Sequence, residues 1–381
     1  MFLKKSCVTK KSGELIVKER NCGIDLLKIV LAFMVLTIHI HANGTGQVLL
    51  YSTTQPWKAL ATLVTFLCYP AVNTYILITG YYSYKAKKEL NGVIISLSRL
   101  WLSALFFSLI GYAISIASGN VFNSLDLLKR FFPITRGVWW FYTVYFALML
   151  LSPFINKMLD SINVGEHRML LAIMLLMLSI LPMFVNWEGQ IGSNYGYSLI
   201  WFIALYITGS YLQRMKSLDN KSINRILVSM VIYVVATISI YIIPKIFSII
   251  GISINLAMYN SIIVYIQAIA LFIFFGNIRL SKGMAKIVGS ISGLALASYL
   301  LHCQEDIEKL LWPGVNPAAY ANSARIIYVT IVICITVFII GVLLESAWEY
   351  ICRVLKIDKN FAEATSKGYV VIERLLRDRG E

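Results

Sequence analysis

Lys28 and His39 lie eleven residues apart in the first apolar segment of the chain, Ile24–Ile40. Eleven residues of α-helix return to within about 20° of the same face and rise about 16 Å along the axis. A cation at the mouth of a membrane helix can bind an anionic group, and an imidazole deeper in the helix can act as a base. Because ionisable residues inside a membrane are costly, we predict that this face carries the function.

The composition is that of a polytopic membrane protein. Of the 381 residues, 58% are hydrophobic and only 14% are charged, and the mean hydropathy is +0.73, whereas about a quarter of a soluble domain is charged. The net charge of +15 would point to nucleic acid or to anionic surfaces in a soluble protein. Here the distribution of basic residues among the loops explains it, so we expect the lipid bilayer, and no nucleic acid, as a partner.

The cysteines carry no metal or disulfide pattern. None of them has CxxC spacing, which argues against a disulfide framework and against a zinc site, and we expect no metal. The six are Cys7, Cys22, Cys68, Cys303, Cys334 and Cys352.

Ten apolar runs are long enough to cross a bilayer, so the sequence predicts an all-α polytopic membrane bundle of about ten transmembrane helices. With a cytoplasmic N-terminus, 27 of the 34 Lys and Arg residues fall in cytoplasmic segments and 7 outside. This bias places both termini in the cytoplasm and predicts a multi-pass protein of the cell (plasma) membrane. The predicted spans lie near residues 24–41, 59–82, 92–117, 138–156, 168–186, 198–213, 225–243, 258–276, 287–302 and 325–348.

The chain divides into three parts. We predict a cytoplasmic N-terminal segment over 1–20, a membrane domain over 21–350 and a cytoplasmic C-terminal tail over 351–381. We expect no cleavable signal peptide, because a polar, Lys-rich stretch precedes a segment that reads as a membrane span. The tail has apolar residues at helical spacing and is predicted to form an amphipathic helix on the cytoplasmic surface. These residues are Val370, Val371, Ile372, Leu375 and Leu376.

The segment Asn21–His41 reads NCGIDLLKIVLAFMVLTIHIH. It resembles the opening signature of the acyltransferase-3 family of integral-membrane O-acyltransferases, in which a basic residue is followed by ten residues and then a His. Lys28 stands where the family usually has Arg, and His39 matches the His. Lys keeps the charge but loses the bidentate fork of a guanidinium.

Four further stretches resemble the same family in the expected order, and the resemblance covers most of residues 20–350. They are Ile78–Tyr82 (ITGYY), Arg99 at the start of the third span, Trp139–Pro153 (WWFYTVYFALMLLSP) and Ser298–His302 (SYLLH). The fourth span lacks the acidic residue that follows the Trp in some peptidoglycan- and lipopolysaccharide-modifying members. The chain therefore looks closer to the branch that decorates exopolysaccharide or capsule, and to the membrane part of certain serine-racemase fusions.

The resemblance implies a membrane O-acyltransferase. It would move an acyl group, with acetyl the expected one, from cytoplasmic acyl-CoA (acetyl-CoA) to a hydroxyl of a cell-surface glycan or of its lipid-linked precursor. His39 would act as the base for that hydroxyl or as a covalent acyl carrier, and the sequence leaves both open. Lys28 would bind the phosphates of coenzyme A with Arg99 as a second cation, and Asp25, three residues before Lys28, would orient it.

The remaining polar residues have a functional and a structural interpretation. We predict acceptor binding by His302, Arg136 and Tyr142, although the aromatic cluster 139–145 is also typical of a membrane-interface belt. His41 is expected at the membrane interface and His167 in solvent. Asn73, inside the second span, needs a hydrogen-bond partner, which we expect on another helix.

Two other function classes remain open. A small-solute transporter would use the same polar path, but its usual sign, paired broken helices in two related halves, is not found in the sequence. A polysaccharide polymerase or flippase would also be basic and polytopic. Such proteins usually carry a large outer loop with several Arg residues, and the outer loops here hold few basic residues.

Overall fold

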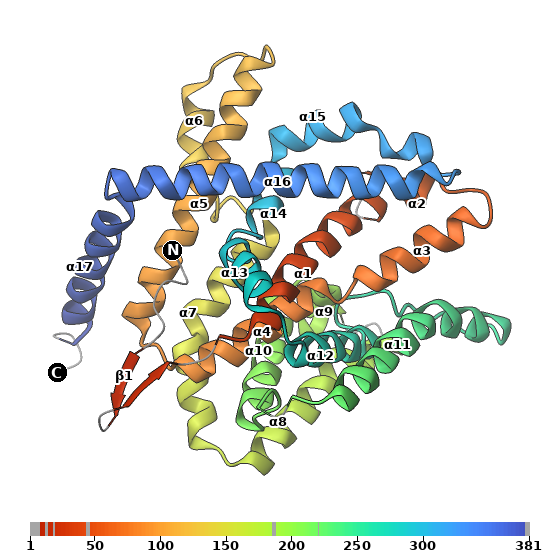
Figure 1. Ribbon diagram of the computed structural model, residues 1–381, viewed down its shortest axis with the longest axis horizontal. Helices are drawn as coiled ribbons and strands as arrows, with labels where there is room; N and C mark the ends of the chain where they lie inside the picture. Colours follow the sequence, from red (N-terminus) through yellow and green to blue (C-terminus); the bar gives the residue numbers. More distant parts are fainter. Residues whose placement is uncertain are drawn as a thin grey trace.

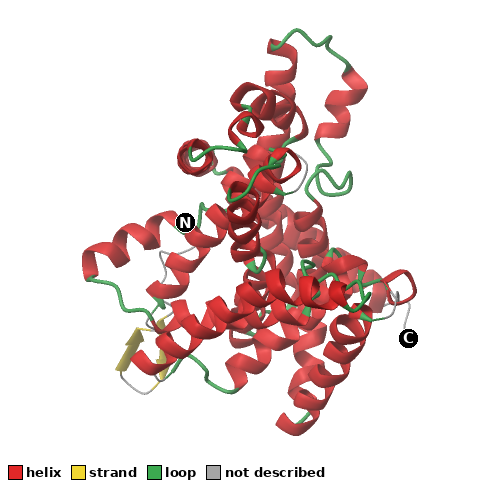
Figure 2. Cartoon of the chain, turned by 90° about the vertical axis from the view of Figure 1, so that its right-hand side faces the viewer, coloured by secondary structure: helices red, strands yellow, loops and turns green. Residues whose placement is uncertain are grey.

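The computed structural model describes residues 8–11, 14–17, 20–42, 46–184, 188–219 and 221–377. Outside one short hairpin the described chain is helical, which confirms the all-α prediction (Figures 1 and 2). The long helices are α1 (Cys22–His41), α3 (Trp57–Cys68), α4 (Ala71–Ala86), α5 (Leu90–Ala117), α7 (Trp140–Ser161), α8 (Val164–Leu175), α10 (Leu199–Arg214), α11 (Ile223–Ile249), α12 (Ile262–Asn277), α13 (Lys282–Ile291), α15 (Glu305–Val315), α16 (Arg325–Val354) and α17 (Ile357–Arg377).

The shorter elements connect these helices. They are α2 (Val48–Tyr51), α6 (Ser124–Arg130), the π-helix η1 (Leu176–Ile180), the 3₁₀ turns η2 (Leu181–Met183), η3 (Asn194–Gly196) and η4 (Pro317–Tyr320), α9 (Glu188–Ile191) and α14 (Ala297–His302). The hairpin pairs β1 (Val8–Lys11) with β2 (Glu14–Val17) antiparallel, with Val8 opposite Val17. This hairpin lies in the polar N-terminal segment, for which the sequence analysis predicted no strands.

Seven helical segments of the described chain are long and apolar enough to cross a membrane. They are Cys22–His41, Trp57–Ala86, Leu90–Ala117, Trp140–Ser161, Val164–Met183, Ile223–Ile249 and Arg325–Val354. The sixth and eighth predicted spans correspond to α10 and α12, which are helices of 16 residues each. The predicted ninth span, 287–302, is not one helix.

The break in that span begins at Ser292, whose side chain makes polar contacts with α1 and with the segment just before it. α13 ends at Ile291, residues 292–296 form turns, and α14 begins at Ala297. Ser292 accepts a hydrogen bond from Arg20 Nη2 at 3.0 Å and donates one to Asp25 Oδ1 at 3.3 Å. Non-helical backbone at membrane depth is tolerated where it is buried in protein or lines a cavity, and residues 292–296 line the large cavity described below.

Helix α1 is central in the bundle (Figure 1) and packs against α3, α4, α12, α13, α14 and α16. Asn21 caps its N-terminus, since its side chain accepts from the backbone N–H groups of Gly23 and Ile24. Gly23 permits the close approach of α12, because a Cβ at that position would lie 1.9 Å from the carbonyl oxygen of Phe275. The start of α1, and with it Lys28, is thereby fixed in the bundle.

Helices α4 and α10 form the most extensive pair in the bundle. Two glycines allow it: a Cβ at Gly80 would lie 2.2 Å from the Tyr206 carbonyl oxygen, and one at Gly209 would lie 2.3 Å from that of Leu77. Asn73 joins the same region, because it donates to the Tyr259 carbonyl at 2.7 Å and accepts from Trp201 Nε1 at 3.2 Å. The prediction that Asn73 bonds across helices is confirmed.

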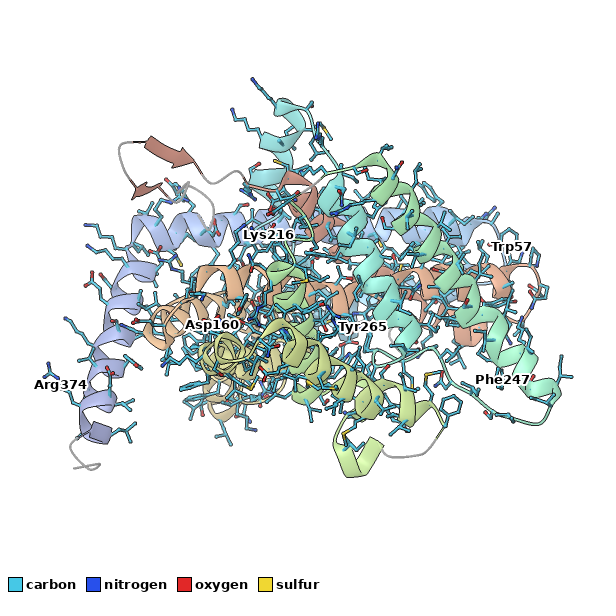
Figure 3. All side chains as sticks on the ribbon, turned by 90° about the horizontal axis from the view of Figure 1, so that it is seen from below. Trp57, Asp160, Lys216, Phe247, Tyr265 and Arg374 are labelled. Atoms are coloured by element: carbon cyan, nitrogen blue, oxygen red, sulfur yellow. The ribbon has the colours of Figure 1, made fainter. Side chains whose placement is uncertain are left out.

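The C-terminal tail forms α17, as predicted, at the edge of the bundle, where Figure 3 labels Arg374. It packs on α5 through stacked rings of Trp101 and Phe361, whose centroids are 5.3 Å apart, and through a 3.1 Å hydrogen bond from Asn91 to Ser366. The five apolar residues named in the sequence analysis are exposed, which fits an amphipathic helix lying on a membrane surface.

Candidate active site

A large cavity opens between α1, α4, α5, α7, the 292–297 segment and α16. It has a volume of about 490 Å³, and its lining includes Lys28, Arg99, Tyr142 and Glu345. Lys28 and Arg99, which the sequence analysis assigned to the same anionic ligand, therefore face one space. This volume is within the range of about 300–1,000 Å³ typical of small-molecule sites.

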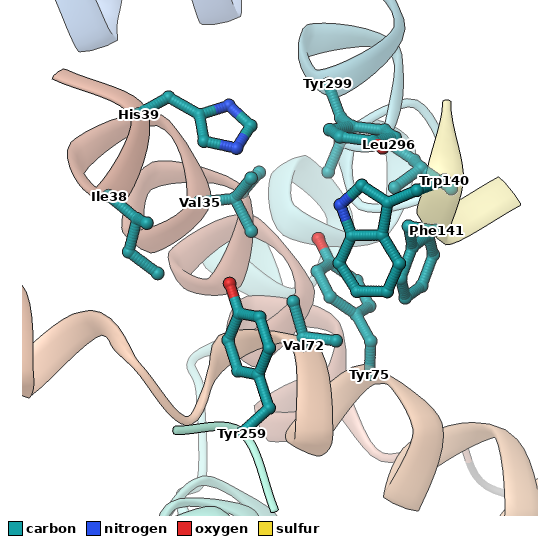
Figure 4. Close-up of a pocket in the computed structure, with 12 residues that line it drawn as sticks. Val35, Ile38, His39, Val72, Tyr75, Trp140, Phe141, Tyr259, Leu296 and Tyr299 are labelled. Carbon is teal, nitrogen blue, oxygen red and sulfur yellow. The ribbon is translucent and has the colours of Figure 1, made fainter. Parts of the chain in front are cut away.

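A small chamber adjoins the large cavity on the side of His39. Its volume is about 20 Å³, and its lining includes His39, Tyr259 and Tyr299. Figure 4 shows the His39 imidazole at one end, with aromatic and aliphatic side chains around the space. Four residues line both spaces: Tyr75, Phe141, Ala295 and Leu296. The two spaces are therefore neighbours, one lined by Lys28 and the other by His39.

His39 is hydrogen-bonded to a second histidine from the other end of the sequence. Its Nδ1 lies 2.7 Å from Nε2 of His302, which is buried at the end of α14. The other ring nitrogen of His302, Nδ1, lies 2.5 Å from the carbonyl oxygen of Ser298. Two imidazoles and one carbonyl therefore form a chain of hydrogen bonds that ends at the small chamber.

The direction of these bonds assigns the protons. A carbonyl oxygen only accepts, so Nδ1 of His302 carries a proton and donates to Ser298. Burial favours the neutral imidazole, which carries only one ring proton. Because that proton is on Nδ1 of His302, its Nε2 is an acceptor, and Nδ1 of His39 must be the donor. This tautomer leaves the basic lone pair of His39 on Nε2.

Cys303 completes the cluster. Its Sγ lies 3.0 Å from Nδ1 of His39, and the three potential ligand atoms of His39, His302 and Cys303 lie within 4.8 Å of one another. In a tetrahedral zinc site with Zn–N bonds near 2.0 Å, two nitrogens are about 3.3 Å apart. The 2.7 Å spacing between the two histidines is therefore that of a hydrogen bond between them.

Lys28 is held at the large cavity by a buried carboxylate. Asp25 is 3% exposed, its Oδ1 lies 3.5 Å from Lys28 Nζ, and it also forms an ion pair with Arg20. Arg20 in turn donates to the carbonyl of Gly289 at 3.0 Å. The expected pairing of Asp25 with Lys28 is present, and Arg20 is a partner that the sequence analysis did not identify.

Charged side chains of both signs line the large cavity. The cations are Lys28, Lys88, Arg99 and Arg353, and the acidic residues are Glu345, Glu349 and Asp358. Burial, and then the neighbouring Arg99 guanidinium, lower the pKa of Lys88 below its usual value. Positive charges that repel one another in this way are stabilised by a bound anion, so the cavity is suited to a phosphate-bearing ligand.

The three residues predicted to bind the acceptor have separate places. His302 contacts His39 directly, and Tyr142 is buried and lines the large cavity. Arg136 lines neither space, because its Nη2 donates to Glu305 at 3.0 Å beside the ion pairs of Arg130 with Glu305 and Asp306. The structure therefore brings His302, but not Arg136, to His39.

Two expectations about histidines are wrong. His41 was expected at the membrane interface but is 4% exposed, with Nε2 3.1 Å from the Thr330 hydroxyl, because α16 packs over that face of α1. His167 was expected in solvent but is completely buried, and its Nε2 donates to the Ile207 carbonyl at 3.1 Å. The reason is that α8 packs on α10.

Three residues of this region were not predicted from the sequence as site residues: Arg20, Cys303 and Glu345. Cys303 directly follows the SYLLH stretch, and that position was the available signal. Arg20 is the last residue of the predicted cytoplasmic N-terminal segment, and Glu345 lies in the last predicted span, where an intramembrane carboxylate is itself a signal of function. The described cysteines are all free, and Cys7 lies outside the described residues.

Comparison with known proteins identifies the family. The acyltransferase-3 family model, described as an acyltransferase domain, matches residues 21–345. The search of curated proteins and the search of solved structures found no match. The matched range contains Lys28, His39, Arg99 and His302, and it covers well over half of the 381 residues. The chain therefore belongs to the acyltransferase-3 family and is a membrane acyltransferase.

Proposed function

We propose that the protein transfers an acetyl group from acetyl-CoA to a hydroxyl of a cell-surface glycan or of its lipid-linked precursor. The observation that carries this proposal is that two neighbouring spaces share four lining residues, with Lys28 and Arg99 on one and His39 on the other. The donor would place its phosphates among the cations of the large cavity and extend its pantetheine arm toward the small chamber.

The donor side requires a particular orientation in the membrane. Because acyl-CoA is cytoplasmic, the end of α1 that carries Lys28 faces the cytoplasm in this proposal, as the distribution of basic residues predicts. We place the protein in the plasma membrane with both termini in the cytoplasm, so that the acceptor reaches His39 from the other side of the bundle.

The size of the small chamber supports a short acyl group. A volume of about 20 Å³ is little more than the roughly 10–15 Å³ of free space that one water molecule needs. Its walls are mostly apolar, with Val35, Val72, Phe141 and Leu296 among them. An acetyl methyl group fits such a space far better than a long acyl chain does.

The tautomer of His39 supports a base role at Nε2. In direct transfer, Nε2 takes the proton of the acceptor hydroxyl, the oxygen attacks the thioester carbonyl and the carbon–sulfur bond breaks. His39 then returns the proton to the leaving thiolate, so that free coenzyme A and the ester are the products. In the covalent alternative, Nε2 itself attacks the thioester carbonyl, and the carbon–sulfur bond breaks to release the coenzyme A thiolate. The acceptor hydroxyl then attacks the acyl group, the carbon–nitrogen bond breaks, and the hydroxyl proton goes to the thiolate, so that the ester and free coenzyme A are again the products.

The proposal is tested by acetyl content. Acetate is measured on the surface polysaccharide of a deletion strain complemented with wild type, His39→Ala, Lys28→Ala or His41→Gln at equal membrane expression. We expect wild type and His41→Gln, the matched control on the same helix, to restore acetylation, and His39→Ala not to. If deletion leaves acetylation unchanged and alters solute uptake or polymer length instead, the transporter or the polymerase alternative replaces this proposal.

A further inference from the structure

A buried carboxylate faces the large cavity without a full set of hydrogen-bond partners. Glu345 of α16 is 8% exposed and lines that cavity. Its Oε1 accepts a hydrogen bond from the Ser103 hydroxyl at 2.6 Å. Its Oε2 is buried and has no hydrogen-bond partner among the described residues. A buried acceptor in this state is costly, and a ligand that donates to it recovers that cost.

Along α16, Glu345 lies between Arg353, a cation that lines the large cavity, and Gly341, which contacts Ser298. Along α16 it precedes Arg353 by eight residues, about 12 Å, and follows Gly341 by one turn, about 6 Å. A Cβ at Gly341 would lie 2.9 Å from the backbone of Ser298, the residue whose carbonyl accepts from His302. Along α16, the carboxylate is therefore at a depth between Arg353 and the helix turn that contacts Ser298.

The proposed donor has N–H groups that could donate a hydrogen bond to Oε2 of Glu345. Between its phosphates and its thioester, acyl-CoA has a pantetheine arm with two secondary amides, and each amide N–H needs an acceptor when it leaves water. We propose that Glu345 accepts a hydrogen bond from an amide N–H of this arm and so positions the thioester toward His39. This inference rests on the proposed function, since it names a contact of the same donor.

If Glu345 contacts the pantetheine arm, its loss should weaken binding only of ligands that have this arm. Ligand binding is measured on the purified full chain in detergent, with coenzyme A and with adenosine 3′,5′-bisphosphate, which has the phosphate end but no pantetheine arm. We expect Glu345→Leu to weaken binding of coenzyme A by about tenfold or more and to leave binding of the bisphosphate unchanged. Glu345→Gln, whose amide oxygen still accepts, should bind coenzyme A close to wild type.

The outcomes separate this inference from the proposed function. If Glu345→Leu weakens both ligands equally, or neither, while the protein stays monodisperse, the pantetheine contact is refuted and the donor assignment stands. The same refutation follows if Glu345→Gln loses as much affinity for coenzyme A as the Leu variant. If wild type binds neither ligand, the donor assignment itself is wrong and this contact falls with it.

Discussion

Removing the acceptor on His302 tests the histidine pair most directly. His302→Phe keeps an aromatic ring in the buried site but has no nitrogen to accept from His39 Nδ1, which now lies 2.7 Å from it. His39 then loses the bond that selects its tautomer and the direction of its ring. His302→Gln is the matched variant, because its side-chain oxygen can still accept.

The size of the effect follows from the cost of an unsatisfied buried donor. That cost is about 1–3 kcal/mol, which corresponds to a decrease of about 5- to 150-fold in kcat. The loss should be smaller than that of His39→Ala, because general base catalysis as a whole contributes about 10²–10⁴-fold. His302→Gln should fall between wild type and His302→Phe.

The assay follows release of free coenzyme A thiol from acetyl-CoA by membranes that contain the acceptor, over a range of donor concentrations. We expect His302→Phe to lower kcat with little change in the KM for acetyl-CoA, because the bond acts at the reacting centre and not on the phosphates. A folded His302→Phe protein with wild-type kcat, or one with only a raised KM, would refute the role assigned to this pair.

Three further predictions concern the donor, the chamber and the packing of the bundle. Lys28→Ala should raise the KM for acetyl-CoA by about tenfold at nearly constant kcat, as expected for a lost phosphate contact, and Lys28→Arg should restore it; a change in kcat alone would contradict the phosphate role. Leu296→Ala shortens a side chain that lines both spaces, and the larger chamber should raise the kcat/KM for butyryl-CoA relative to acetyl-CoA by about tenfold. The same thiol-release assay measures this ratio, and an unchanged ratio would show that the chamber does not limit the length of the acyl chain. Gly80→Val places its Cβ 2.2 Å from the Tyr206 carbonyl oxygen and should sharply reduce the yield of monodisperse protein in size-exclusion chromatography. The control Gly283→Ala, whose Cβ meets nothing within 4 Å, should leave that yield unchanged.

Much of the architecture could be predicted because it depends on local properties. Apolar runs of sufficient length predict helices wherever they occur, and the helical repeat alone relates Lys28 to His39. The broken ninth span could not be predicted in this way. Its sequence is apolar enough for a helix, but Arg20 and Asp25 hold Ser292 from about 270 positions away in the chain.

Burial of single polar residues was the least predictable property. His41 and His167 were judged by their distance from the ends of predicted spans, but their burial depends on which helix packs over them. Asn73 was predicted correctly because an amide in an apolar span needs a partner whatever its neighbours are.

The sequence by itself determined an all-helical membrane protein and its family, together with one helix face that carries Lys28 and His39. Composition, hydrophobic run length and helical periodicity are properties of contiguous residues, so they need no knowledge of packing. Only the tertiary structure decided that His302, 263 positions from His39, accepts its hydrogen bond, that Cys303 lies beside this pair and that Glu345 lines the large cavity. Contacts of this kind depend on how helices distant in sequence pack together, and no local pattern specifies that packing.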